Sequence, residues 1–261
     1  MPVLLPTTNL QYGSLNAGAL YDGDTKVWPP PPFVPPSRYE EQIISSTPLS
    51  YWRLGEPIGS STAVDKMGYH DAAYTGAPVL GVAGLIEGDL DAAMQVFGLG
   101  SQGMNAGNTD FQLYHDFTVE CWFKTTTPGT SFRSLVVKQN DYGIFIIDNK
   151  LAVYEWGSAL IVDSGIRVDD SVRHHAVVVF GINYGPAESQ LYLDGLPVGP
   201  LFSHTLLDQN HTLAVGYNDY ASQELTGVID EVAIYNRRLT AIEVAMNHDV
   251  GVASPTNWRE L

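Results

Sequence analysis

The sequence predicts an all-β protein: an antiparallel β-sandwich of the jelly-roll type, with an extended N-terminal arm and two short peripheral helices. From about residue 49 onward, short segments alternate apolar and polar residues with a period of two, as half-buried strands do. Turn residues separate these segments, and no long helical patterns come between them. This combination favours two antiparallel sheets that pack face to face.

The composition supports a folded core and excludes some partners. Hydrophobic residues make up 44% of the 261 residues, which is enough for a sizeable core. Thirteen Lys and Arg against 29 Asp and Glu give a net charge of -16, which disfavours contact with nucleic acid or anionic membranes. We see neither a secretory signal nor an apolar stretch of roughly 18 residues, so we expect no membrane insertion.

The predicted arm covers residues 1–36 and ends in the proline-rich run WPPPPFVPP. Proline runs favour an extended backbone and lack hydrogen-bond donors, so we expect no sheet or helix here. The arm is also too apolar for a solvated linker, and we expect it to be buried against a partner protein or the chain's own sandwich. Its candidate docking residues are Tyr21, Val27, Trp28 and Phe33.

Two short helices are expected at the ends of the sandwich. Ser37 and Glu40 have the spacing of a capping box, which predicts a helix over 38–45. Thr240 and Glu243 repeat this spacing and predict a second helix over 241–248. The predicted parts are therefore an arm over 1–36, a sandwich over 37–251 and a tail over 252–261.

The strand HDFTVECWFK illustrates the alternation. Phe117, Val119, Cys121 and Phe123 share one face, and polar residues occupy the other. Cys121 is the only cysteine, so no disulfide can form within the chain, and we interpret it as a buried thiol.

Five motifs carry a resemblance to a known family: PLSYWRLGE (48–56), DFTVECWFK (116–124), RHHAVVVF (173–180), LYLDGLPVG (191–199) and TGVIDEVAIYNRRLTAIEV (226–244). The stretch from Tyr39 to about His248 resembles the laminin-G-like domains of the concanavalin A-like lectin and glucanase superfamily. This resemblance implies the same sandwich that the alternation predicts.

One carboxylate stands among apolar residues in the last motif. Alternation places Asp230 on one face with Val228 and Val232, and a buried carboxylate needs a partner. In this superfamily the Asp of the final strand often helps to bind a structural calcium with groups from the N-terminal segment. The resemblance implies one calcium held by Glu56, Asp65 and Asp230. The alternative is that Asp230 only caps loop amides.

The arm adds a second resemblance. ALYDGDTKVWPP (19–30) is similar to a short segment of tail proteins from phages that infect actinobacteria. Laminin-G-like domains that begin with a helix and PxxYWRLGE are common in the minor tail proteins of those phages, and the start of this predicted sandwich resembles them. Both marks occur together in this chain.

Catalytic chemistry is not expected. Glycoside hydrolases of the superfamily place two carboxylates in an E-x-D-x-x-E run, whereas Glu87 and Asp89 are followed by Ala92. We interpret that segment as a surface loop. His174 and His175 are adjacent on a strand, so their side chains point to opposite faces and cannot bind one metal ion together. The sequence therefore predicts a protein that is not an enzyme.

Carbohydrate recognition stays open, because sugar sites combine aromatic faces with amide and carboxylate groups on loops. Three segments have such residues: YNDYASQ (217–223), KQNDY (138–142) and YEWGS (154–158). The ordinary interpretation of these segments is turn chemistry at the rim of the sandwich. The candidate ligand-binding residues are Trp156, Asn218, Asp219 and Tyr220.

The leading hypothesis is a phage virion structural protein, a minor tail or tail-tip protein assembled in the host cytoplasm. The arm would bind other virion proteins, and the sandwich would bind host surface glycan or protein, or reinforce the particle, in a homo-oligomer. A capsid decoration protein is a close variant. The alternative from another class is a bacterial carbohydrate-binding module or adhesin, and a third is a divergent glycosidase.

Overall fold

A computed structural model of the chain divides it into two units, residues 1–36 and 37–261. It describes residues 20–22, 25–28, 37–108, 110–181, 188–205, 207 and 210–253.

The first unit contains two paired strands. β1 (Leu20–Asp22) and β2 (Thr25–Trp28) are antiparallel, with Tyr21 opposite Lys26. The expectation that no part of the arm enters a sheet is therefore wrong for these strands. The physical reason is that the prolines, which lack donors, follow β2 in the sequence and do not interrupt it. Phe33 lies outside the described residues, and the docking role of the arm stays a prediction.

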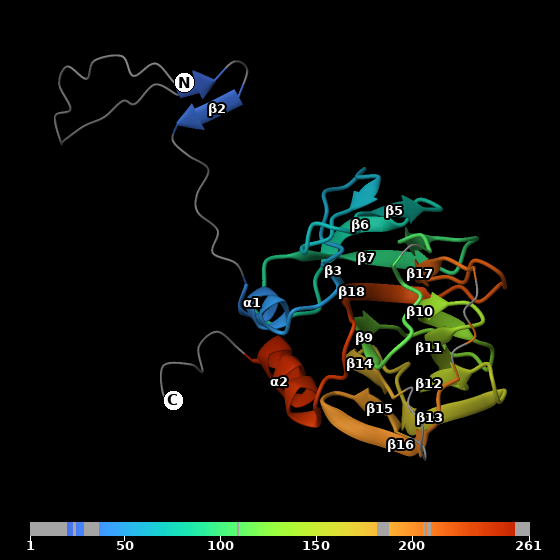
Figure 1. Ribbon diagram of the computed structural model, residues 1–261. Helices are drawn as coiled ribbons and strands as arrows, with labels where there is room; N and C mark the ends of the chain where they lie inside the picture. The colour runs from blue at the N-terminus through green and yellow to red at the C-terminus, as the bar shows by residue number, and fades with distance from the viewer. Residues whose placement is uncertain are drawn as a thin grey trace. The chain divides into compact units, whose positions relative to one another are not determined.

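The second unit is a sandwich of two antiparallel sheets (Figure 1). The first sheet has the strand order β13 (Leu160–Arg167), β12 (Lys150–Glu155), β11 (Tyr142–Ile147), β10 (Arg133–Lys138), β17 (Leu213–Val215), β8 (Gly103–Asn105), β5 (Ala72–Thr75) and β4 (Thr62–Ala63). The second sheet has the order β16 (Leu196–Phe202), β15 (Ser189–Leu193), β14 (Arg173–Phe180), β9 (Phe117–Lys124), β18 (Thr226–Tyr235), β7 (Ala92–Phe97) and β6 (Val79–Ala83), and β3 (Ser50–Trp52) pairs with β18.

The inner faces of the two sheets enclose the main core. In β9 the predicted inner face is confirmed, because Phe117, Val119, Cys121 and Phe123 all belong to that core. The strand is not half-buried as expected, since every residue of it except Lys124 is buried. Cys121 is fully buried, and burial raises the pKa of its thiol. The predicted antiparallel sandwich with two peripheral helices is thus confirmed.

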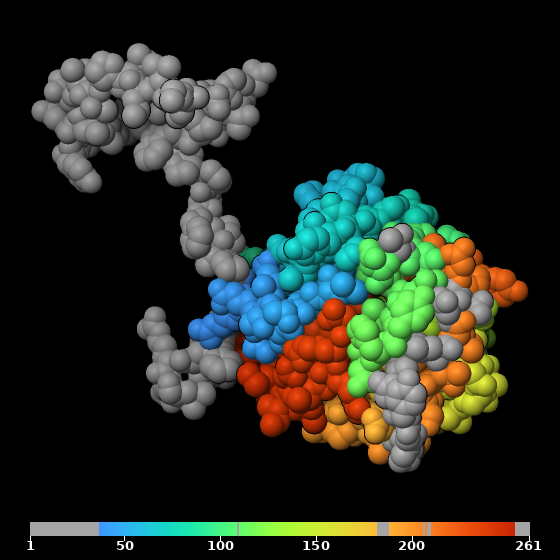
Figure 2. Space-filling model, in the orientation of Figure 1, coloured from blue at the N-terminus to red at the C-terminus, as the bar shows by residue number. Residues whose placement is uncertain are grey.

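The two helices lie side by side on the outer face of the second sheet (Figure 2). α1 (Arg38–Ser45) covers the range that the capping pattern predicts, and Ser37 Oγ accepts a hydrogen bond from Glu40 N at 2.9 Å. α2 (Ala241–Val252) begins as predicted, with a complete capping box, and continues beyond the predicted end at 248. Beneath them, Trp122 Nε1 donates to the Tyr39 hydroxyl at 2.7 Å.

The last strand departs from regular alternation. Glu231 has a φ of 53°, and the register of β18 against β9 shifts between Asp230 and Ala233. Val232 therefore lies in the inner core, whereas Val228 packs against the outer cluster. The prediction that Val228 and Val232 share a face is wrong, because this β-bulge inserts a residue between them.

Candidate functional site

The structure places the three predicted calcium ligands in separate hydrogen-bonding roles. Asp65 organises the turn that follows it. Its Oδ1 accepts hydrogen bonds from the backbone of Tyr51 at 2.8 Å and Met67 at 3.0 Å. Its Oδ2 accepts from the backbone of Tyr69 at 3.2 Å and His70 at 3.0 Å. Four backbone donors thus satisfy this carboxylate without a metal ion.

Glu56 accepts hydrogen bonds from Val64 N at 2.8 Å and from the Tyr74 hydroxyl. Asp230 is 1% exposed, and its Oδ2 accepts from Leu85 N at 2.8 Å. Within the described ranges, no group of three or more His, Cys, Asp and Glu could hold a metal ion. Glu56, Asp65 and Asp230 therefore do not fit one calcium site, and calcium binding stays a prediction. The alternative role of Asp230, as a cap for a loop amide, matches its contact with Leu85.

The guanidinium of Arg53 lies among several carboxylates at this end of the sandwich. Arg53 Nη2 lies 2.7 Å from Glu231 Oε1 and 2.5 Å from Asp89 Oδ2. Arg53 also forms ion pairs with Glu40 at 3.2 Å and Asp91 at 3.1 Å. The bulge in β18 brings Glu231 to this cluster, and burial raises the pKa of Glu231 to about 7 despite the nearby guanidinium.

The same ion pair corrects the interpretation of Asp89 as part of a surface loop, whereas the Glu87 side chain is 45% exposed. The Asp89 side chain is only 9% exposed because it packs against Arg53. The Arg of the YWRLGE motif was the available signal, since a buried Arg needs carboxylate partners.

A second site lies on the outer face of the first sheet. A cavity of about 310 Å³, here called the aromatic pocket, is lined by Phe132, Gln139, Phe145, Tyr154, Trp156, Ile161 and Gln223. All three segments that the sequence singles out for carbohydrate recognition meet here. KQNDY supplies Gln139, YEWGS supplies Tyr154 and Trp156, and YNDYASQ supplies Gln223.

Four aromatic rings form a closed set in this pocket. Tyr154 and Trp156 are perpendicular with ring centres 5.1 Å apart, and Phe145 lies 5.9 Å from Trp156. Phe132 completes the set at 5.2 Å from Phe145 and 5.5 Å from Tyr154. Phe145 is buried, while the other three rings keep partial exposure. Such half-exposed rings present apolar faces on which a sugar ring can stack.

Trp156 sits on a turn that a buried carboxylate holds from below. Glu155 Oε1 accepts hydrogen bonds from Gly157 N at 3.0 Å and Thr205 N at 3.1 Å. Glu155 Oε2 lies 2.6 Å from His204 Nδ1, and both side chains are 1% exposed. These contacts join the end of β12 to the loop after β16, and so they hold Trp156 in place.

The amides at the edge of the pocket are oriented by Asn218. Its Nδ2 donates to Gln139 Oε1 at 2.6 Å and to Gln223 Oε1 at 2.7 Å. Asn218 is 5% exposed, so it supports the pocket and does not line it. Amide groups fixed in this way can exchange hydrogen bonds with sugar hydroxyls.

Asp219 and Tyr220 belong to a neighbouring loop contact and not to the lining of the pocket. Asp219 Oδ2 accepts hydrogen bonds from Thr212 N at 3.0 Å and Thr212 Oγ1 at 3.2 Å. The Tyr220 ring is 71% exposed and lies against His211 with centres 5.5 Å apart. The structure thus brings Trp156 and Asn218 together and leaves Asp219 and Tyr220 apart from them.

Five lining residues are not among the predicted ligand-binding residues: Phe132, Gln139, Phe145, Tyr154 and Gln223. For Tyr154 a signal existed, because it stands two residues before Trp156 and residues at that spacing share a strand face. Gln139 and Gln223 lie within the segments KQNDY and YNDYASQ that were singled out, whereas for Phe132 the sequence offers no such signal.

A family model places the chain among known proteins. The laminin-G-type model described as the concanavalin A-like lectin/glucanases superfamily matches residues 99–245, more than half of the chain. The chain belongs to this superfamily. The predicted resemblance is thereby confirmed, although the match begins later than Tyr39. No curated protein sequence matches the chain.

Several solved structures share the fold of this chain. The Trypanosoma rangeli sialidase in complex with 2,3-difluorosialic acid matches with a TM-score of 0.56 and 14% identity, over 78% of this chain and 33% of the sialidase. The binding domain of Paraclostridial Mosquitocidal Protein 1 matches with a TM-score of 0.56 and 14% identity, over 77% of this chain and 52% of that domain. Domain 4 of the arabinanase AbnA from Geobacillus stearothermophilus, in complex with arabinotriose, matches with a TM-score of 0.50 and 17% identity, over 76% and 97% of the two chains.

These matches establish a lectin/glucanase-like fold. At such identities they show the fold alone, and the chain spans about a third of the length of the sialidases. They also correct the prediction that the protein is not an enzyme. That prediction treated a missing carboxylate motif as sufficient, whereas sialidases share this fold. A catalytic role is thus not excluded by the fold.

None of the helices in the described ranges is long and apolar enough to span a membrane.

Proposed function

We propose that this protein is a phage virion component, a minor tail or tail-tip protein, whose sandwich binds glycan on the host surface through the aromatic pocket. The observation that carries the binding proposal is the closed set of four aromatic rings edged by two oriented amides. Aromatic faces with a few placed polar groups are the usual composition of a sugar-binding surface.

The superfamily and its structural neighbours support glycan binding. One neighbour carries a sialic acid derivative and another carries arabinotriose. The virion assignment has separate support, namely the resemblance of ALYDGDTKVWPP and of the YWRLGE region to phage tail proteins. On this proposal the arm, residues 1–36, attaches the protein to other virion proteins. Several copies on one particle would strengthen weak glycan contacts through their high effective concentration.

One observation favours a second candidate, a bacterial carbohydrate-binding module or adhesin. The chain covers 97% of domain 4 of the arabinanase, which binds an oligosaccharide as a domain of a larger glycoside-acting protein. A role in capsid decoration is the nearer variant, because an arm and a compact β-domain would serve on a head as well.

The binding proposal is tested with a glycan array and actinobacterial cell-wall preparations. We expect the full chain to bind, and Trp156→Ala and Tyr154→Ala each to weaken binding by about tenfold, which corresponds to about 1.4 kcal/mol. Tyr69→Ala is the matched control, because Tyr69 is 80% exposed and lies outside the pocket. Equal binding by all four proteins would contradict a role for the aromatic pocket.

The virion assignment is tested separately. Antibodies against the protein are expected to label the tails of particles of the encoding phage in immunogold electron microscopy. Label on the heads would support capsid decoration instead. Particles without label or protein would contradict the virion role and favour the bacterial module.

A further inference from the structure

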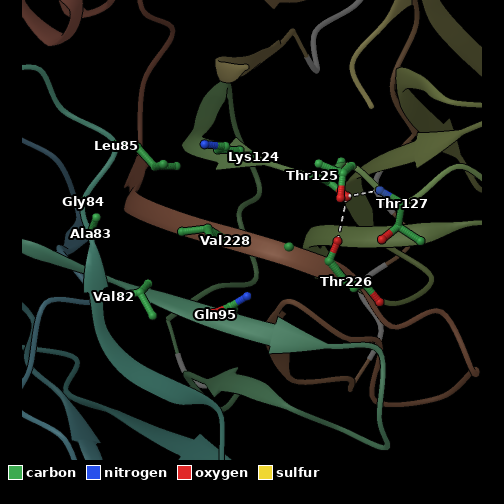
Figure 3. Close-up of a pocket in the computed structure, with 12 residues that line it drawn as sticks. Val82, Ala83, Gly84, Leu85, Gln95, Lys124, Thr125, Thr127, Thr226 and Val228 are labelled. Atoms are coloured by element: carbon green, nitrogen blue, oxygen red, sulfur yellow. Dashed lines mark hydrogen bonds between the residues drawn. The ribbon is translucent and has the colours of Figure 1, made fainter. Parts of the chain in front are cut away.

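A second cavity lies on the other sheet, away from the aromatic pocket. It has a volume of about 360 Å³, at the small end of the range for small-molecule sites, and is here called the threonine pocket. Figure 3 shows its lining, with Lys124 on β9, Val228 on β18 and Gln95 on β7. Thr127 and Thr226 line the end of the pocket that is opposite Gly84 and Leu85. Because Val228 packs against the outer cluster, the pocket is on the outer face of the second sheet.

The charge at this pocket is unusual for so acidic a chain. Lys124 pairs in register with Arg173 on β14, and residues directly opposite in an antiparallel pair point to the same face. Two like charges in that arrangement destabilise a sheet. Glu87 relieves only one of them, since its Oε2 lies 2.8 Å from Arg173 Nη1. Within the part of the chain that the structure describes, the exposed Lys124 makes no ion pair.

Polar groups with spare hydrogen-bonding capacity surround this cation. Gln95, Thr126 and Thr226 line the cavity, and among the described residues their side chains form no hydrogen bond. Thr125 is different, because its hydroxyl is already used. It donates to Thr226 O at 2.6 Å and accepts from Thr127 N at 3.1 Å, as the dashed lines in Figure 3 mark. The free groups offer hydroxyl and amide partners to a ligand with several hydroxyls.

The walls are held by contacts below the surface. Asp230 Oδ2 accepts from Leu85 N at 2.8 Å and so fixes the segment that forms one wall. Arg133 Nη1 donates to Thr127 O and fixes the loop that forms the other. A pocket with fixed walls loses little conformational entropy when a ligand binds.

We propose that the threonine pocket binds a polyhydroxylated ligand that carries an anionic group, with the carboxylate or phosphate on Lys124 and the hydroxyls on Gln95, Thr126 and Thr226. The anion neutralises the cation that the sheet leaves unpaired. This site is independent of the aromatic pocket and of the virion role, and it adds a preference for charged glycans or polyol phosphates to a protein of net charge -16.

Isothermal titration calorimetry on the full chain tests the proposal with three probes: a galacturonate trimer, a galactose trimer and a glycerol phosphate trimer. At low salt we expect at least one anionic probe to bind at least about tenfold more tightly than the galactose trimer, and the preferred probe identifies carboxylate or phosphate as the natural group. Higher salt is expected to weaken that binding, because an exposed charge pair is screened.

Lys124→Met is expected to weaken binding of the anionic probe by about tenfold or more, and Thr226→Val to weaken it severalfold. Lys150→Met is the matched control, because Lys150 is partly exposed and already paired with Asp163 at 3.2 Å. Unchanged affinity in Lys124→Met, equal affinity for the galactose trimer, or no binding of either anionic probe would overturn the proposal.

The proposals for the aromatic pocket and the threonine pocket can be contradicted independently. Trp156→Ala is expected to leave binding of the anionic probe unchanged, since Trp156 lies on the other sheet. Loss of anion binding in Lys124→Met with intact cell-wall binding would locate the charge preference in the threonine pocket. Loss of anion binding in Trp156→Ala alone would place it in the aromatic pocket and contradict the inference.

Discussion

His174 Nδ1 lies 2.8 Å from Asp194 Oδ2, which joins the start of β14 to the turn after β15. The other oxygen of Asp194 accepts a hydrogen bond from His175 N at 2.8 Å. Asp194 has a φ of 51° and precedes Gly195 in the tight turn. Two motifs that are separate in the sequence, RHHAVVVF and LYLDG, therefore form one physical contact, and the first His of the pair has a structural role.

This contact predicts a pH dependence of stability. Burial disfavours the charged form of His174, yet hydrogen bonds to Asp194 and Asp170 outweigh it and raise the pKa of His174 above its usual 6.5. The folded state therefore binds the proton more tightly than the unfolded chain. This contribution is fully present below pH 6.5 and is lost as pH rises through the folded pKa.

Urea unfolding between pH 5.5 and 8.5 measures this contribution. Wild-type protein is expected to lose stability above about pH 6.5, and His174→Gln is expected to make that slope smaller, with the raised pKa of Glu231 contributing the remainder, and to cost about 1 to 2 kcal/mol at pH 6. His115→Gln is the control, because His115 is exposed and its one hydrogen bond among the described residues is to the neighbouring Asp116 carbonyl. A slope of equal size in His174→Gln would refute the assignment.

Arg53→Met is expected to be strongly destabilising. It would leave Glu231 buried without its cation, together with Asp89, and breaking one partner of a buried ion pair costs about 3–5 kcal/mol. The measurement is chemical denaturation at pH 7. Arg167→Met is the control, because the Arg167 side chain is 68% exposed in its pair with Asp169, and such pairs contribute about 1 kcal/mol or less. Similar losses in both variants would contradict a special role for Arg53.

Asp230→Asn separates the hydrogen-bonding role of Asp230 from calcium binding. Burial and the neighbouring Glu231 raise the pKa of Asp230 well above its usual value of 3.8. The stability of the fold is therefore expected to fall as pH rises from 3.8 to the raised pKa, because ionising the buried carboxyl is unfavourable. Asparagine keeps an acceptor for Leu85 N and removes the charge. The variant is thus expected to have a higher Tm than wild type at pH 8 and the same Tm at pH 4.

A calcium-dependent rise in Tm would contradict a role for Asp230 in hydrogen bonding alone. Thermal unfolding of both proteins at pH 8, with calcium and with a chelator, is the measurement. If wild-type Tm rises with calcium and Asp230→Asn abolishes that rise, Asp230 is a metal ligand and its role is not limited to the hydrogen bond with Leu85 N.

Glu155→Gln is expected to weaken both the pocket and the fold. Gln has one acceptor oxygen where Glu155 serves Gly157 N, Thr205 N and His204, so a buried donor is left unpaired at a cost of about 1–3 kcal/mol. Because Trp156 follows directly, glycan binding is also expected to fall severalfold. Glu41→Gln, at an exposed position of α1, is the control for both measurements.

Much of the fold could be predicted because its signals are local. The period-two pattern of β9 places Cys121 and Phe123 in the core, and the capping residues Ser37 and Thr240 mark the helix starts. The pattern fails at Glu231, where one residue with positive φ shifts the alternation without any change in residue type that would reveal it.

The candidate site could be predicted only in part. The three segments rich in amide and aromatic residues were recognisable, and Trp156 among them, but their meeting at one pocket depends on the pairing of β10 with β11 and β17. The calcium ligands were inferred from residue type, whereas the donors that occupy Asp65 come from a turn whose geometry the residue types do not reveal.

By itself the sequence determined many of the sandwich strands, most of their buried faces, the helix starts and the superfamily, because periodicity, capping and motif order are properties of neighbouring residues. Only the tertiary structure decided that Arg53 pairs with buried carboxylates, that Gln139 and Gln223 meet Trp156, and that Lys124 lies opposite Arg173 and makes no ion pair with any described residue. The physical reason is that these contacts join residues far apart in the chain, and their geometry follows from strand register and from one bulge in β18.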